Sequence, residues 1–380
     1  MNIDELLKAA IEKGSSDLHL KVGVYPMVRI NGGLAPLDKF PKVNQEESVA
    51  LAFSVMNPSQ KEKFKERFEL DLAYSAAGLG RFRVNVFKQR GTIGMVFRVI
   101  PVKVSSIREL LLPPVVEKLS LEHRGMVLVT GTTGSGKSTT LASMVDFINQ
   151  NRTVNIITIE DPIEFLHRDK KGIVSQREIG QDTESFSLAL RSALRQDPDV
   201  ILVGEMRDFE TISTALVAAE TGHLVLSTLH TLDAVETVNR IIAVFPPYQQ
   251  KQVRMQLASV IRGIVSMRLA ARADGKGRVP AAEIMVGTQT VREAIVDPEK
   301  TRHIHDIIAA GSSQYGMQTF DQSLHDLFKK QLVSYEEALK WTSNPEDFAL
   351  KVKGIQSTSE SWEEAQVKDE GGGKLHVDRF

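Results

Sequence analysis

The first hundred residues combine two hydrophobic patterns. Apolar residues recur at helical spacing over residues 3–11 and stop before Gly14, and the same spacing over residues 45–56 and 58–68 predicts two more short helices. Polar and apolar side chains alternate over residues 17–22, 27–30, 80–87 and 92–99, which predicts strands of a small antiparallel sheet. We therefore expect residues 1–100 to form one compact α+β domain.

The pattern changes after residue 100. Pro101 and the pair Pro113-Pro114 interrupt it, so we place a linker at residues 101–120. Beyond this point the apolar runs become continuous, and helical stretches separate them; they lie at residues 126–129, 155–159, 200–203 and 224–226. Strands that crossover helices bury on both faces have this pattern, so residues 121–287 are expected to form an α/β core.

After Thr231 the spacing becomes largely helical. Residues 267–286 interrupt it, and residues 273–277 within them suit a hairpin turn. We expect a helical C-terminal region at residues 288–354. Residues 355–380 are polar and contain three successive glycines, which predicts a disordered tail.

Composition narrows the class of protein. The chain has 380 residues, and 47 lysines and arginines stand against 48 acids, which argues against a surface built for nucleic acid or anionic lipid. No apolar run is long enough to cross a bilayer, and the start lacks the features of a signal peptide. The absence of cysteine rules out disulfides and thiolate metal sites. We therefore expect a cytoplasmic protein.

The segment from Gly131 to Ser138 matches the pattern G-x-x-x-x-G-K-[ST] in full, between an expected strand and an expected helix. Glycines let such a loop turn its backbone N–H groups towards phosphates, and the start of the following helix favours negative charge. Lys137 is placed to reach the terminal phosphates, and the Ser138 hydroxyl to coordinate Mg²⁺. We expect ATP and Mg²⁺ as cofactors, with ATP held by Gly131, Thr132, Thr133, Gly134, Ser135, Gly136, Lys137, Ser138 and Thr139.

Carboxylates follow two of the expected strands. Glu205 comes after the strand at residues 200–203, where the Walker B carboxylate of P-loop proteins holds Mg²⁺ directly or through water. The cluster from Glu160 to Glu164 follows the strand at residues 155–159, and a carboxylate there is suited to deprotonate the attacking water. We take Glu164 as the first candidate for this base and Glu160 as the second. Solvated charge at a strand end is the alternative for any one of these acids.

Two histidines, His223 and His230, flank the expected strand at residues 224–226. The run from Ser227 to Thr231 adds polar groups at the end where His230 lies. Phosphate sensing by His230 is a hypothesis, because histidines more often act as ordinary hydrogen-bonding residues. Two histidines without a third suitable ligand do not make a typical closed zinc site.

Four segments in this order resemble the secretion ATPase superfamily. They are the P-loop, the acidic box at residues 160–164, the run Gly204-Glu205-Met206-Arg207-Asp208, and a histidine box at residues 222–230. The similarity extends from Asp17-Leu-His-Leu20 to about Gly354 and so covers nearly the whole chain. Within the superfamily the chain looks like the PilT-type retraction ATPases of type IV pili, the twitching motility proteins.

The resemblance implies an α/β architecture with a PAS-like N-terminal domain before a RecA-like P-loop core. It further implies a homohexamer whose ATP hydrolysis drives pilus retraction, that is, depolymerisation of pilin. The ring would lie at the cytoplasmic face of the inner membrane and reach the membrane only through partners. Those partners would be an inner-membrane pilus platform protein and a paralogous retraction ATPase, with no nucleic acid among them.

The same resemblance implies that arginines of the N-terminal domain approach the nucleotide at subunit contacts. Arg81 and Arg83 are the candidates, and residues two apart on a strand do point to one face. From the residues alone, it is equally possible that Arg81 and Arg83 are simply basic side chains on a solvated strand face. Further candidates for the same work are Arg195, Arg207 and Arg240.

Retraction is favoured within the superfamily because extension and secretion members usually carry a tetracysteine module, and this chain has no cysteine. The stretch Thr290-Val-Arg-Glu-Ala-Ile-Val-Asp297 stands where retraction members often carry Ala-Ile-Arg-Asn-Leu-Ile-Arg-Glu, so an accessory paralogue stays open. Pilus extension and type II secretion are the nearest alternatives. A RecA-like nucleic-acid motor and a small-molecule kinase are the alternatives from other classes.

Overall fold

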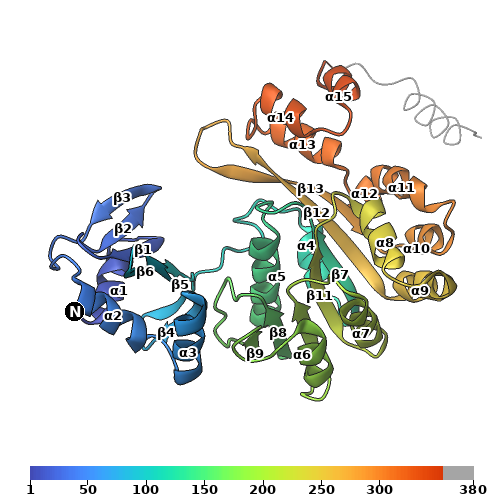
Figure 1. The fold of residues 1–380 in the computed structure, drawn as a ribbon. Helices are drawn as coiled ribbons and strands as arrows, with labels where there is room; N and C mark the ends of the chain where they lie inside the picture. The colour runs from blue at the N-terminus through green and yellow to red at the C-terminus, as the bar shows by residue number, and fades with distance from the viewer. Residues whose placement is uncertain (354–380) are drawn as a thin grey trace, which may run out of the picture. The chain divides into compact units, whose positions relative to one another are not determined.

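The computed structural model of the protein describes residues 1–353, whose helices and strands Figure 1 shows. These residues divide into two compact units. The first unit contains Met1–Val104 and Asn149–Pro198, and the second contains Ser105–Ile148 and the chain from Asp199 onward. The tail expected at residues 355–380 lies outside the described residues. Within residues 1–353, no helix is both long and apolar enough to cross a membrane.

An antiparallel six-stranded sheet, in the order β3-β2-β1-β6-β5-β4, dominates the first hundred residues. Its strands are β1 (Asp17–Lys21), β2 (Met27–Ile30), β3 (Gly33–Pro36), β4 (Glu69–Ala76), β5 (Gly80–Gln89) and β6 (Thr92–Val99). Three helices accompany it: α1 (Ile3–Glu12), α2 (Gln45–Ser54) and α3 (Pro58–Arg67). The helices and strands expected here are all present, with ends that differ by at most two residues.

One face of this sheet is the core of the N-terminal part. Alternation along the strands buries Leu18, Phe82 and Phe97, which pack with the apolar residues of α1, α2 and α3. The α2 and α3 helices begin at capping boxes that supply partners for their first N–H groups. Because strand residues alternate between faces, the polar residues of β5 are left on the opposite face.

The other sheet has seven strands in the order β13-β12-β7-β11-β10-β8-β9. Its strands are β7 (Gly125–Thr130), β8 (Asn155–Glu160), β9 (Ile173–Glu178), β10 (Val200–Val203), β11 (Leu224–Leu229), β12 (Ile261–Ala271) and β13 (Arg278–Val286). Every residue of β7, β10 and β11 is buried, as the continuous apolar runs predicted. The β12–β13 hairpin closes at the turn expected at residues 273–277.

Helices connect these strands and form the C-terminal region. The connecting helices are α4 (Val115–Ser120), α5 (Lys137–Asn151), α6 (Phe186–Ala193), α7 (Phe209–Glu220), α8 (Ala234–Ala243) and α9 (Pro247–Val260). The C-terminal helices are α10 (Gln289–Val296), η1 (Thr301–His303), α11 (Ile304–Ala310), α12 (Ser312–Tyr315), α13 (Phe320–Lys329), α14 (Tyr335–Trp341) and α15 (Pro345–Val352). Apolar residues of α13, α14 and α15 pack against the outer part of the β12–β13 hairpin.

Four elements were not expected from the sequence. Strand β3 is short, and both β3 and β4 lie mostly outside the core, so their alternation is weak. Strand β9 carries mainly polar side chains at the end of its sheet. Helix α4 lies within the residues expected as a linker and follows Pro114, which suits the start of a helix. Strand β12 also begins earlier than expected, directly after α9.

Candidate active site

The P-loop connects the end of β7 to the start of α5. Its three glycines, Gly131, Gly134 and Gly136, all have a positive φ, between 77° and 138°. A Cβ atom added to Gly131 would lie 2.5 Å from both the Met267 carbonyl oxygen and the Ser135 hydroxyl oxygen. Only glycine therefore fits this position, and the loop can curl tightly beneath the first turn of α5.

Lys137 is held against the loop that precedes it. Its Nζ donates hydrogen bonds to the carbonyl oxygens of Gly131 at 2.8 Å and Thr132 at 2.9 Å. The lysine is buried, whereas Ser138 and Thr139, which follow it in the first turn of α5, are partly exposed. The positive end of a fifteen-residue helix and a lysine thus stand together at this loop, an arrangement that suits bound phosphate.

Strand β12 supports the P-loop from one side. The Thr130 hydroxyl donates to the Ser266 hydroxyl at 2.9 Å, and the Thr140 hydroxyl lies 3.0 Å from the sulfur of Met267. The β12 strand runs parallel to β7 and beside it. Ser266 and Met267 were not expected as site residues, because nothing in a sequence shows which strand will neighbour the P-loop strand.

The carboxyl ends of β7, β11 and β10 meet at one edge of the sheet, because the three strands are parallel and lie in that order. Glu205 follows β10 and His230 follows β11, so both reach the edge where the P-loop begins. The Thr228 hydroxyl donates to the Gly204 carbonyl oxygen at 2.6 Å, which ties the two strand ends together.

Glu205 stands between two basic side chains at this edge. Its Oε1 atom lies 2.5 Å from Nε of Arg207 and 3.3 Å from Nε2 of His230. Asp208, the next acid in this run, instead caps α7 by accepting from Thr211. The structure therefore brings together Glu205 and His230, two of the expected catalytic residues, with Arg207, one of the further candidate arginines.

The second histidine lies elsewhere. His223 precedes β11 and stands at its other end, where Nδ1 lies 2.8 Å from the Ala218 carbonyl oxygen at the end of α7. This contact is that of an ordinary hydrogen-bonding histidine. Of the two expected histidines, only His230 reaches the P-loop edge of the sheet.

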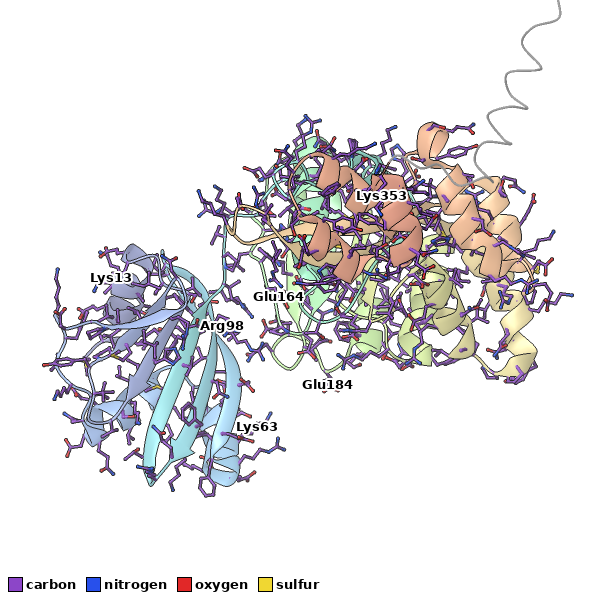
Figure 2. All side chains as sticks on the ribbon, turned by 90° about the horizontal axis from the view of Figure 1, so that it is seen from above. Lys13, Lys63, Arg98, Glu164, Glu184 and Lys353 are labelled. Carbon is purple, nitrogen blue, oxygen red and sulfur yellow. The ribbon has the colours of Figure 1, made fainter. Side chains whose placement is uncertain are left out.

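The acidic box lies in the first unit, after β8. Glu160 ends β8 and accepts hydrogen bonds from the Thr158 hydroxyl at 2.7 Å and from Nε2 of Gln176 at 3.0 Å. Burial raises the pKa of Glu160 above its usual range, and the neighbouring Glu164 carboxylate acts in the same direction, whereas the two hydrogen bonds oppose it. Glu164 is exposed and lies in the loop that follows β8 (Figure 2).

The two candidate arginines of β5 differ in their surroundings. The Arg81 side chain is 19% exposed, and its Nη2 lies 3.0 Å from Oε2 of Glu178 on β9. Arg83 is exposed on the same side of β5. Arg195 and Arg240 are also exposed. Glu178 is a buried carboxylate that the sequence analysis did not select, because its strand was not expected.

The donor set at the P-loop suits Mg²⁺. No group of three histidines, aspartates or glutamates within residues 1–353 is placed to hold a metal on its own. Mg²⁺ bound with a nucleotide needs only one or two oxygen ligands from the protein, since phosphates and water supply the others. The Ser138 hydroxyl and the Glu205 carboxylate are hard oxygen donors of this kind.

A P-loop between a buried parallel strand and a long helix, with a carboxylate at the end of a nearby strand, defines the class of P-loop nucleoside triphosphatases. Residues 106–365 match the family described as type II/IV secretion system protein. The chain is 47% identical to the type IV pilus retraction ATPase PilT of Pseudomonas aeruginosa, and the match covers 92% of this chain and 100% of that protein.

Two further comparisons agree. The chain is 42% identical to the type IV pilus ATPase PilU of Pseudomonas aeruginosa, over 93% of this chain and 92% of that protein. A crystal structure of the pilus retraction motor PilT with bound ADP matches with a TM-score of 0.83 and 46% identity, and it covers 91% of this chain and 98% of the other.

The chain therefore belongs to the type II/IV secretion system protein family and, within it, to the PilT-type ATPases. It binds nucleotide and is an ATP-hydrolysing enzyme. The expected α/β fold class and the resemblance drawn from the four sequence boxes are both confirmed.

Proposed function

We propose that this protein is a motor that hydrolyses ATP to retract type IV pili by removing pilin from the base of the filament, for twitching motility. The observation that carries the proposal is its 47% identity to a retraction ATPase along that protein's whole length. The P-loop, Glu205 and His230 at one sheet edge supply the parts that such an ATPase needs.

In this proposal the backbone N–H groups from Gly131 to Thr139 hold the phosphates of ATP, and Lys137 moves its Nζ from the loop carbonyls to the terminal phosphates. Ser138 and Glu205 hold Mg²⁺, Glu205 through water because its carboxylate already contacts two basic groups. The ion, when bound, neutralises charge on the phosphates. His230, beside Glu205, is placed to respond to the terminal phosphate.

Glu164 remains the first choice for the base that deprotonates the attacking water. Burial favours the protonated form of Glu160, which cannot accept a proton, whereas Glu164 is exposed. Glu160 is the second choice. Glu205 is the third, because its contacts with Arg207 and His230 already engage its charge.

We further propose that six copies form a ring in which Arg83 of one subunit contacts the nucleotide of the next. Arg83 suits this role better than Arg81, because Arg81 is paired with Glu178 in its own chain. The domains would be a PAS-like part at residues 1–100, a linker at 101–120, a RecA-like core at 121–287 and a helical part at 288–354. The ring would act at the cytoplasmic face of the inner membrane, on a pilus platform protein.

Deletion of the gene tests the direction of the motor. Loss of a retraction motor leaves many surface pili but no twitching motility, and the gene encoding the Lys137→Ala protein should fail to restore motility. Bald cells would instead indicate pilus extension and would overturn the proposal. Normal motility that is lost only when a second retraction ATPase is also deleted would point to an accessory paralogue, as the divergent α10 region allows.

A further inference from the structure

Strand β9 presents two polar side chains to the acidic loop. It pairs with β8 in parallel, with Gln176 beside Thr158 and Glu178 beside Glu160. Residues two apart on a strand point to the same side, so Gln176 and Glu178 both face the loop that contains Glu164. All of these residues belong to the first unit.

Gln176 uses its whole amide group on this loop. Its Nε2 donates to Oε1 of Glu160 at 3.0 Å and to the carbonyl oxygen of Phe165 at 2.9 Å. Its Oε1 accepts from the N–H of His167 at 2.9 Å. A glutamine amide has two donor hydrogens and one acceptor oxygen, so each of these groups holds a different point of the loop.

Glu178 holds the same loop from a buried position. The residue is 5% exposed, and its Oε2 accepts from the N–H of Ile163 at 3.2 Å and from Nη2 of Arg81 at 3.0 Å. Burial of a carboxylate is costly unless charged and N–H groups surround it. Arg81 supplies a charged partner of this kind and holds Glu178 in place to accept from the Ile163 N–H.

The two contacts fall on either side of Glu164, since Ile163 precedes it and Phe165 follows it. We propose that Gln176 and Glu178 are positioning residues for ATP hydrolysis, which clamp the backbone on both sides of Glu164 and so direct its carboxylate. The inference rests on the proposed role of Glu164 as the base. Small displacements of a catalytic group cost far more in rate than in binding, so the clamp acts on turnover rather than on nucleotide affinity.

The single variants Gln176→Ala and Glu178→Ala of the full chain test the clamp. We expect kcat for ATP to fall about tenfold or more, while the Kd for a fluorescent ATP analogue stays within about twofold. Glu178→Gln should recover most of the activity, because its amide oxygen still accepts from the Ile163 N–H. Ser175→Ala, an exposed position on the other side of β9, is the matched control and should retain full activity.

Normal turnover in Gln176→Ala, or an equal loss of affinity and turnover in it, would overturn the proposal. Gln176→Ala also serves if Glu178→Ala does not fold, because Gln176 is only partly buried. A thermal melt of each variant shows whether it folds.

The Glu164→Gln background separates positioning from general damage. If Gln176 acts through Glu164, adding Gln176→Ala to Glu164→Gln should not lower the residual single-turnover rate further. If Gln176→Ala lowers the rate as much in the Glu164→Gln protein as in the wild type, the clamp is overturned. Wild-type turnover by Glu164→Gln alone would overturn the base assignment and the clamp with it, whereas impaired Glu164→Gln beside normal Gln176→Ala would overturn the clamp alone.

Discussion

At the scale of single residues, the site depends on the surroundings of its carboxylates. Glu160 and Glu164 are separated by three residues in the chain, yet burial raises the pKa of the first, while the second is exposed. Glu205 lies on another strand and contacts Arg207 and His230. Three acids near strand ends therefore have three different environments, which is the basis for giving them different roles.

The base assignment gives the first prediction. Glu164→Gln keeps the size of the side chain but removes its ability to accept a proton, so ATP should bind with near-normal affinity while turnover falls about a hundredfold or more. Phosphate release and binding of a fluorescent ATP analogue measure the two effects. Normal phosphate release would mean that Glu160 or Glu205 is the base. Lys137→Ala is the comparison variant, because it should weaken nucleotide binding itself.

Glu283 on β13 gives a pH prediction. The residue is 3% exposed, and its Oε1 accepts from the N–H of Ala234 at the start of α8 at 2.9 Å. Burial raises the pKa of Glu283 to about 7 from an ordinary 4.5, and Asp233 acts in the same direction. Between these two values the folded protein binds more protons than the unfolded chain, so this group lowers stability as the pH rises.

Glu283→Gln should remove this dependence, because glutamine stays neutral and still accepts from the Ala234 N–H. Between pH 5 and pH 8, the free energy of unfolding of the variant should rise relative to that of the wild type by up to about 3 kcal/mol. Thermal unfolding midpoints of both proteins across this range measure it. Parallel curves for the two proteins would show that Glu283 does not titrate there.

At the scale of elements, the P-loop is shaped by its neighbour β12 as well as by its own glycines. The Met267 carbonyl oxygen lies 2.5 Å from the position of a Cβ atom on Gly131, whereas a Cβ atom on Gly134 would meet nothing within 4 Å. Both glycines have positive φ, so both positions disfavour other residues, but only Gly131 is also blocked by a backbone atom.

The two glycines make a matched pair of variants. Gly131→Ala should weaken nucleotide binding by at least about tenfold, because the loop must move away from β12. Gly134→Ala carries only the backbone cost of about 1–2 kcal/mol and should retain binding. Titration with a fluorescent ATP analogue distinguishes them, and equal losses in both variants would mean that β12 does not shape the loop.

Strand β9 shows why an element can escape prediction and still matter. Its sequence Ile-Val-Ser-Gln-Arg-Glu carries few apolar residues, and it pairs with β8 at the end of the sheet order. Hydrophobic alternation reveals strands that bury one side in a core. The side of β9 that faces the loop containing Glu164 instead carries Gln176 and Glu178, which bind that loop. Polar side chains that are satisfied by one particular loop leave no periodic signal.

At the scale of the whole molecule, the proposed ring requires a site completed by two subunits. Arg83 is exposed, and the proposal gives it the nucleotide of a neighbouring subunit as its partner. An arginine that acts on another subunit's nucleotide can be tested by mixing two inactive proteins.

Arg83→Ala and Lys137→Ala should each be nearly inactive as pure assemblies. When they are mixed and reassembled, some Lys137→Ala subunits present an intact Arg83 to a neighbour with an intact P-loop, so ATPase activity should rise above that of either protein alone. The increase should be largest near equal proportions. Activity equal to the weighted average at every proportion would place Arg83 outside any shared site.

The sequence by itself determined the class of the protein. The P-loop, the acidic and histidine boxes and the buried strands are local in the chain, and local spacing and chemistry are what a sequence displays directly. The order of strands and the contacts between distant residues were decided only in the tertiary structure. Arg81 of β5 meets Glu178 of β9, a strand of the other sheet, and Ser266 of β12 meets Thr130 of the adjacent strand β7, although both pairs are distant in sequence. No periodic pattern encodes such pairs, since each depends on how whole elements pack.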